Sequence, residues 1–125
     1  MKRVLPLASV LALALSACSG SGTSEPAETV PAGALVVKAV SGLKFDAKTY
    51  GPVPAGEVTI GYVNEDSMRH TLIIAKDGEK VGAFKLEVAR AGKVDVGAVE
   101  LPAGEYVLLC DVPGHGSMKA TLTVE

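Results

Sequence analysis

Four side chains that bind soft metal ions stand out in this sequence. Cys110, His115 and Met118 lie within nine residues, and His70 lies forty residues before the cysteine. Thiolate and thioether sulfur favour Cu(I), and imidazole binds copper in either oxidation state. Two histidines and one cysteine in a trigonal arrangement, with a weak axial methionine, form a recognised copper geometry. These residue types and their spacing therefore predict a copper site.

Short β-strands would have to position these side chains. From Leu35 onward, apolar and polar residues alternate in short segments that are rich in Val, Ile, Thr and Tyr and are broken by Gly and Pro. About eight such strands predict an all-β, two-sheet sandwich that hides its two apolar faces against each other. No stretch has a convincing helical period, although residues 83–92 could form a turn of helix in place of a strand. The expected strands lie near residues 35–40, 43–50, 57–64, 70–75, 80–88, 93–99, 104–110 and 118–124.

Turn signals predict which loops share an end of the sandwich. Pro-Ala-Gly precedes three expected strands, at residues 31–33, 54–56 and 102–104. Proline presets a turn dihedral and glycine relieves the exit, so each tripeptide is expected to form a tight turn. If the strands alternate in direction, these turns gather at one end. The loops expected at the other end, where all four candidate ligands would lie, are 41–42, 65–69, 89–92 and 111–117.

The phase of the strands predicts how the ligands face. Cys110, Met118 and His70 each share the parity of the apolar residues of their own strand, so they should point toward the core. His115 alone lies within a loop. We therefore expect His115 to be the ligand nearest to solvent.

The N-terminus predicts export. Residues 1–17 combine Lys2 and Arg3 with an apolar run and small residues at the end, which is typical of a signal peptide. The run is shorter than the about 20 residues that a membrane-spanning helix needs. The stretch Leu15-Ser16-Ala17-Cys18 further resembles the lipobox of bacterial lipoproteins, in which the cysteine is lipidated and becomes the mature N-terminus. An ordinary soluble secretory signal is the alternative.

Residues 18–34 are expected to tether the folded domain, 35–125, to a membrane through lipidated Cys18. Residues 19–29 are almost wholly Ser, Gly, Thr, Glu, Pro and Ala, which bury too little apolar surface to fold. A flexible coil of residues 19–34 would reach about 20–25 Å, enough for a small domain to reorient over a surface. The expected location is the cell envelope, on the periplasmic or extracellular face of a membrane.

The cysteine count bears on Cys110. The sequence has two cysteines, so lipidation of Cys18 would leave Cys110 without a disulfide partner. A lone thiol in an exported protein indicates a reactive group or a metal ligand, with a buried inert thiol as the alternative.

Charge excludes one class of partner. Without Lys2 and Arg3 the chain has ten basic and fourteen acidic residues, a net charge of −4. These charges are interspersed and form no basic stripe, so we expect no binding to nucleic acid.

The residues around the ligands resemble those of the cupredoxins, single-domain blue-copper proteins of the plastocyanin and azurin class. The resemblance covers about residues 35–125. It implies a Greek-key sandwich that holds one type 1 copper ion through His70, Cys110 and His115, with Met118 as the axial ligand. The segments that carry it are Gly104-Glu105-Tyr106 leading into Cys110, Val112-Pro113-Gly114-His115, Met118-Lys119-Ala120-Thr121-Leu122-Thr123-Val124, and Asn64-Glu65-Asp66-Ser67-Met68-Arg69-His70.

The sequence departs from the family pattern in two places. Only two residues separate His115 from Met118, where many relatives have three or four. Relatives also commonly carry Asn after the first histidine and a small hydroxyl residue after the cysteine. Here the pair is Thr71 and Asp111, with the hydroxyl and the acceptor exchanged. A hydrogen bond between them would still tie the two ligand loops together.

The resemblance implies an electron carrier that cycles between Cu(I) and Cu(II). We expect no enzymatic activity, because four protein ligands leave no open position and no nucleophile stands beside a base. Redox partner proteins would dock transiently near His115, which Pro113, Gly114 and Gly116 frame as a small apolar rim. Met68 is expected to be exposed packing or part of a docking patch. The expected state is a monomer.

Three alternatives stay open at this point. A copper chaperone or storage protein would need an exchangeable site, often with several methionines. This chain has only three, and Met1 would be lost with the signal peptide. Zinc also binds Cys and His, but a structural zinc site is usually closed by a fourth Cys, His or carboxylate. Asp111 is the candidate for that fourth ligand, although its position at a strand exit points it away from Cys110. A metal-free adhesin or scaffold is the third alternative.

Overall fold

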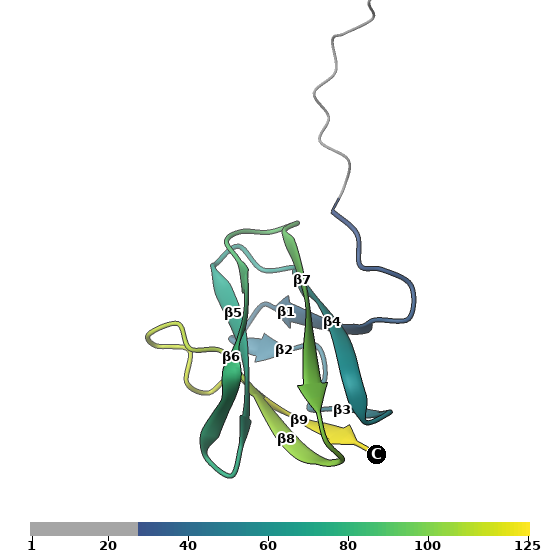
Figure 1. The fold of residues 1–125 in the computed structure, drawn as a ribbon. Coiled ribbons are helices and arrows are strands. Elements are labelled where there is room, and N and C mark those ends of the chain that lie inside the picture. The colour runs from purple at the N-terminus through teal and green to yellow at the C-terminus, as the bar shows by residue number, and fades with distance from the viewer. Residues whose placement is uncertain (1–27) are drawn as a thin grey trace, which may run out of the picture.

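The computed structural model describes residues 28–125, which form two β-sheets packed face to face (Figure 1). One sheet has the strand order β2-β1-β4-β7 and the other β3-β9-β8-β5-β6. The predicted all-β, two-sheet sandwich is confirmed, and within residues 28–125 no helix could cross a membrane. The expected signal peptide, Cys18 and the first part of the expected tether lie outside the described residues. The strands are β1 (Leu35–Val40), β2 (Lys44–Phe45), β3 (Thr49–Val53), β4 (Gly56–Asn64), β5 (His70–Lys76), β6 (Glu79–Val88), β7 (Val94–Leu101), β8 (Gly104–Leu109) and β9 (Lys119–Val124).

The single strand predicted over 43–50 is wrong, because the chain changes sheets within it. β2 pairs with β1 in one sheet, whereas β3 pairs with β9 in the other. Asp46 fixes the crossing: its carboxylate accepts hydrogen bonds from the Lys38 amide (3.0 Å) and the Tyr50 hydroxyl (2.5 Å), and its own amide donates to the Lys38 carbonyl (2.9 Å). These hydrogen bonds hold the connection between β2 and β3, where the chain belongs to neither sheet. The alternative helical turn in 83–92 does not form, since β6 continues to Val88.

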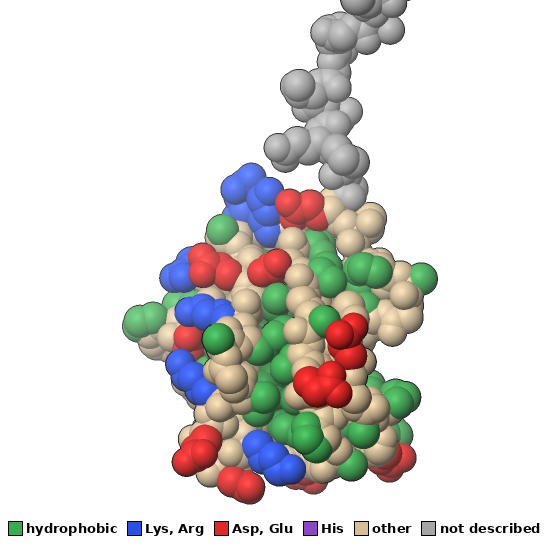
Figure 2. Space-filling model, viewed as in Figure 1, with side chains coloured by type: hydrophobic (Ala, Val, Ile, Leu, Met, Phe, Trp, Pro, Cys, Tyr) green, Lys and Arg blue, Asp and Glu red, His purple; other side chains and the backbone are tan. Residues whose placement is uncertain are grey.

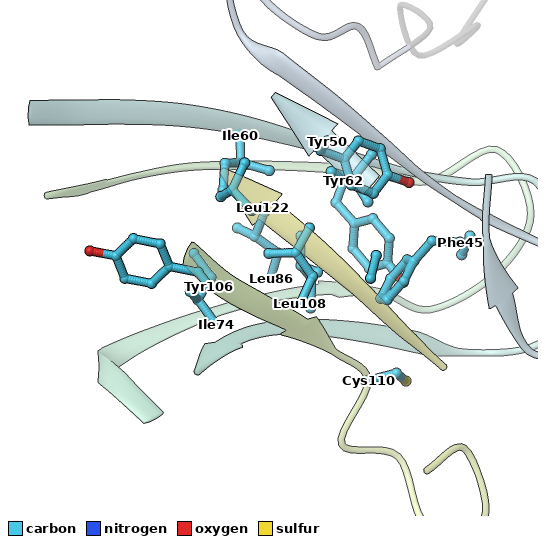
Figure 3. Packing of buried hydrophobic residues seen from close by; sticks show 14 of the residues in the cluster. Phe45, Tyr50, Ile60, Tyr62, Ile74, Leu86, Tyr106, Leu108, Cys110 and Leu122 are labelled. Carbon is cyan, nitrogen blue, oxygen red and sulfur yellow. The ribbon is translucent and has the colours of Figure 1, made fainter. Parts of the chain in front are cut away.

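Inward-facing side chains of both sheets form one hydrophobic core (Figure 3). Burying each large aliphatic or aromatic side chain stabilises a fold by about 1.5–3 kcal/mol. Cys110 lies at the border of this cluster, where the chain leaves β8 (Figure 3). His70 and Met118 are fully buried and Cys110 is 5% exposed, so the predicted inward phase of all three is confirmed. Cys110, Met118 and His70, three of the candidate ligands, therefore lie against the packed apolar core.

Strand register places the loops at two opposite ends. β4 and β6 end at the same end of the sandwich, where Val63 pairs with Val94 and His70 pairs with Val88. β8 runs toward that end as well, because it is antiparallel to β5, which begins there. The turns at 54–56 and 102–104 lie at the other end, as predicted. We call the first end the ligand end. Its loops are 41–43, 65–69, 89–93 and 110–118.

Candidate metal centre

Three of the predicted ligands converge at the ligand end. His70 opens β5, Cys110 follows β8, and His115 lies in the loop that leads to β9. The potential ligand atoms of the three side chains all lie within 4.8 Å of one another. The Cys110 Sγ is 3.6 Å from His115 Nδ1, and the two imidazole rings are 5.0 Å apart between centroids. Side chains that are 40 and 45 residues from His70 in sequence thus form one cluster.

Consecutive turns fold the loop between Cys110 and Met118 back on itself. The His115 amide donates to the Val112 carbonyl (2.9 Å), and the Met118 amide donates to the His115 carbonyl (2.9 Å). Gly114 adopts φ +87°, a left-handed conformation that glycine reaches without steric cost. The Cys110 amide then donates to the Met118 carbonyl (3.3 Å), which closes the loop. The buried Met118 side chain consequently starts from a backbone position beside Cys110.

The two nitrogens of His70 have unequal surroundings. Its Nε2 lies 2.8 Å from the Asp66 carboxylate, so Nε2 carries the ring hydrogen and donates it. Its Nδ1 is buried and has no hydrogen-bond partner among the described residues. A buried polar atom without a partner costs about 1–3 kcal/mol. A metal ion bound at Nδ1 would satisfy this atom, and the second nitrogen is oriented by a carboxylate as in many metal-ligating histidines.

Asp66 is a residue of the candidate site that sequence reasoning missed. Its carboxylate is nearly buried, and the hydrogen bond from His70 is the main reason that the pKa of the Asp66 carboxyl lies below its ordinary value. Asn64 holds the loop, because its side-chain oxygen accepts from the Asp66 amide (2.8 Å) and its amide group donates to the Met68 carbonyl (2.7 Å). The Asn-x-Asp pattern indicates an ordered turn. It does not reveal that Asp66 reaches the histidine.

Thr71 and Asp111 join the two ligand loops, as predicted. The Thr71 hydroxyl donates to the Asp111 carboxylate (2.5 Å), and the Asp111 amide donates back to the Thr71 oxygen (2.9 Å). Since the single hydroxyl hydrogen is committed to Asp111, the Thr71 backbone amide is the donor to Cys110 Sγ, at 3.4 Å. The hydroxyl of Thr71, and then Lys85, hold the pKa of the Asp111 carboxyl below its usual range. Cys110 thus lies within a fixed set of hydrogen bonds.

The carboxylates close to the cluster do not complete a zinc site. Asp111 uses its two oxygens on Thr71 and Lys85 (3.1 Å), as its expected direction away from Cys110 implied. Asp66 lies behind His70, on the Nε2 side. Within residues 28–125, the group of close potential ligands contains no fourth histidine, cysteine or carboxylate. A structural zinc site normally has one, so the zinc alternative loses its support.

Solvent reaches the cluster at His115. This residue is 9% exposed, against 5% for Cys110 and 0% for His70 and Met118, so it is the most exposed of the four, as predicted. Pro113, Gly114 and Gly116 around it are exposed. Met68 is 42% exposed, as expected for a surface side chain. The imidazole of His115 is therefore the part of the cluster closest to solvent.

The four side chains fit a type 1 copper site. They supply two imidazoles, one thiol and one thioether, the soft and borderline donors that select copper. Side-chain hydrogen bonds hold His70 and Cys110 without the ion, and backbone hydrogen bonds hold the positions of His115 and Met118. The site is preformed, because the two sheets and the Thr71–Asp111 pair position its members.

Comparison with known proteins identifies the fold. No family model and no curated protein matches the sequence. Among solved structures, auracyanin of Roseiflexus castenholzii is 20% identical, with a TM-score of 0.62, and the match covers 74% of this chain and 96% of that one. Auracyanin A of Chloroflexus aurantiacus, described as a "blue" copper protein, is 21% identical with a TM-score of 0.59, covering 74% and 98%. Amicyanin of Paracoccus versutus is 22% identical with a TM-score of 0.55, covering 77% and 85%. The sandwich is thus cupredoxin-like.

Proposed function

We propose that this protein is a blue-copper electron carrier of the cell envelope, anchored to a membrane by a lipid on Cys18. The convergence of His70, Cys110 and His115 on one point of a cupredoxin-like sandwich carries the copper part of this proposal. The auracyanins and amicyanin share the fold, and one of them is described as a blue copper protein. Bound copper supplies a one-electron couple between Cu(I) and Cu(II).

The protein's contribution is to hold the ligands still when the charge of the centre changes. Asp66 orients His70, and the Thr71 amide contacts the Cys110 sulfur. Such supporting hydrogen bonds fix ring orientation and tune a metal centre. Both His70 and Met118 are inaccessible to water, so little solvent has to reorganise around them. These features suit rapid, reversible electron transfer rather than turnover of a substrate.

His115 is the proposed point of electron exit. Its side chain is the most exposed of the four, and small residues surround it. A redox partner that docks briefly needs only a small contact area, and the exposed Pro113, Gly114 and Gly116 offer such an area without bulky side chains. We expect the partner to approach within contact distance of the imidazole edge.

Burial of the ligands argues against the chaperone or storage alternative. Copper hand-over requires that an incoming ligand reach the metal, but Cys110 and Met118 are 5% and 0% exposed. The two functions can be distinguished by mixing the copper-loaded protein with a metal-free copper-binding peptide and measuring how much copper is transferred. A carrier retains its copper through many redox cycles, whereas a chaperone releases it rapidly.

The visible spectrum of the copper-loaded protein tests the proposal. A thiolate bound to Cu(II) in a trigonal site absorbs strongly, so the oxidised protein should be blue and Cys110→Ser should be colourless. Ser117→Ala, an exposed change in the same loop, is the matched control and should stay blue. A colourless protein that contains one copper ion, or a protein that prefers zinc from an equimolar mixture, would refute the assignment.

The anchor is tested separately by fractionating cells that produce the protein or Cys18→Ala. The lipidated protein should sediment with membranes and the variant should not, because two or more acyl chains hold a protein stably where one is marginal. Equal solubility of the two would remove the anchor from the proposal and leave the copper site unaffected.

A further inference from the structure

The residues before β1 lie against the sandwich. The Ala34 amide donates to the Pro31 carbonyl (3.3 Å), and Gly33 adopts φ +84°, so the chain reverses direction just before β1. Upstream of this turn, the Val30 side chain covers Gly61 on β4. Figure 1 shows the chain passing the start of β7 before it bends round into β1. Residues 28–34, the part of the expected tether that the structure describes, therefore contact the domain.

Gly61 provides the space that Val30 fills. It faces outward on β4, between the inward-facing Ile60 and Tyr62, yet it is buried. A Cβ at this position would lie 2.3 Å from a Val30 methyl carbon. Glycine weakens a strand interior and often marks the close approach of another segment. Here the approaching segment belongs to the N-terminal part of the same chain.

Glu28 makes the second contact. Its carboxylate accepts hydrogen bonds from the Val94 amide (2.7 Å) and from Lys93 Nζ (3.2 Å). Val94 opens β7, an edge strand whose outward N–H groups would otherwise face solvent. The Val94 amide, and then Lys93, lower the pKa of the Glu28 carboxyl, so this group is ionised at neutral pH. We call the contacts of Glu28 and Val30 with β4 and β7 the clasp.

The clasp lies toward the ligand end. The Lys93 carbonyl accepts from the Asn64 amide (2.9 Å), and the Asn64 side chain donates to the Met68 carbonyl (2.7 Å), two residues before His70. Acidic and basic side chains lie next to each other at the top of the view, where the described part of the chain begins (Figure 2). β1 itself runs toward the ligand end, parallel to β4. Without the turn and the clasp, the chain would therefore approach β1 from the opposite end.

We propose that the clasp orients the metal centre toward the membrane that holds Cys18, and so selects redox partners embedded in or attached to that membrane. This inference rests on the proposed lipid anchor. Ten residue-to-residue steps lead from Cys18 to Glu28, which limits the span to about 33–36 Å. Held only from Leu35, the chain would have seventeen residue-to-residue steps from Cys18 and could extend to about 56–61 Å. The clasp thus shortens the tether and moves its attachment point toward the ligand end.

Amide hydrogen exchange at Val94 tests the clasp without any membrane. In Glu28→Ala the Val94 amide loses its acceptor, and we expect its exchange to accelerate at least tenfold. Gly61→Val, which displaces Val30, should accelerate it as well. Glu57→Ala, an exposed glutamate on β4 outside the clasp, is the matched control and should have no effect. Unchanged exchange in Glu28→Ala would overturn the proposal.

Fluorescence quenching on vesicles tests the orientation. The lipidated full chain is bound to phosphatidylethanolamine and phosphatidylglycerol vesicles that carry a headgroup quencher, with a reporter at Ser117 near the ligand end or at Lys80 near the opposite end. We expect several-fold stronger quenching at Ser117, and a ratio near one when Glu28→Ala and Gly61→Val are combined. A ratio that these substitutions leave unchanged would overturn the proposal. Failure to bind vesicles would overturn the anchor and the orientation together, while exchange at Val94 still reports on the clasp alone.

Discussion

The hydroxyl of Tyr62 should destabilise the folded protein, and its removal should reveal this. The Tyr62 side chain is fully buried, its Oη has no hydrogen-bond partner among the described residues, and burial strongly raises the pKa of its phenol. The ring packs against Phe45 at 6.1 Å between centroids, a contact that phenylalanine retains. Tyr62→Phe therefore removes a desolvated polar group and leaves the packing of the ring in place.

The expected gain follows from two opposing effects. Burying an unpaired hydroxyl costs about 1–3 kcal/mol, which the variant recovers. The lost oxygen leaves a void of about 10–15 Å³, similar to one water-sized probe. At about 24 cal/mol per Å³ this void costs about 0.3 kcal/mol. The net increase in the free energy of unfolding should be about 0.7–2.7 kcal/mol.

Urea denaturation of the metal-free protein measures this change, because bound copper would add its own binding energy to the folded state. The other two tyrosines provide controls of opposite sign. Tyr106 donates to the Pro102 carbonyl (2.7 Å) and Tyr50 donates to the Asp46 carboxylate (2.5 Å), so replacing either with phenylalanine should destabilise by about 1–3 kcal/mol. If Tyr62→Phe destabilises the protein as these controls do, the hydroxyl has a partner and the reasoning fails.

The remaining predictions concern the metal centre. Asp66→Ala should weaken copper binding by about 10–100-fold in a chelator competition, because the first histidine ligand loses its orienting hydrogen bond, whereas Glu65→Ala next to it should not. Thr71→Val should lower the free energy of unfolding by about 1–3 kcal/mol, because the Asp111 carboxylate loses its donor; an unchanged urea midpoint would contradict this role. Gly116→Glu should keep the blue absorption, since no atom lies within 4 Å of a Cβ there, but should markedly slow electron transfer, because the added charge must be desolvated on docking. An unchanged rate at matched ionic strength would show that electrons leave by another surface.

Local periodicity accounts for the parts of the fold that were predictable. A strand has a side-chain period of two, so parity alone places Cys110, Met118 and His70 on the core side of their strands. Their burial follows from the same pattern. The short segments bounded by glycine and proline likewise indicate a sandwich. The position of His115 within a loop was enough to predict that it is the most exposed of the four.

The strand predicted over 43–50 shows where periodicity is insufficient. Its alternation continues through residues 46–48, although the chain there passes from one sheet to the other. The decisive contact is between Asp46 and Lys38, eight residues apart, and the pairing partner of β3 is β9, more than sixty residues away. Alternation specifies which face of a strand is apolar. It does not specify which neighbour the strand joins.

The sequence by itself determined the types of the candidate donors, their spacing and the strands that flank them. Only the tertiary structure decided which groups support those donors. Asp66 stands behind His70, the Thr71 amide contacts the Cys110 sulfur, and Val30 fills the space above Gly61. Donor chemistry is a property of single side chains and can be recognised in a linear sequence. Contacts between residues 31 or 39 positions apart exist only after two sheets have packed, because register and packing bring them within bonding distance.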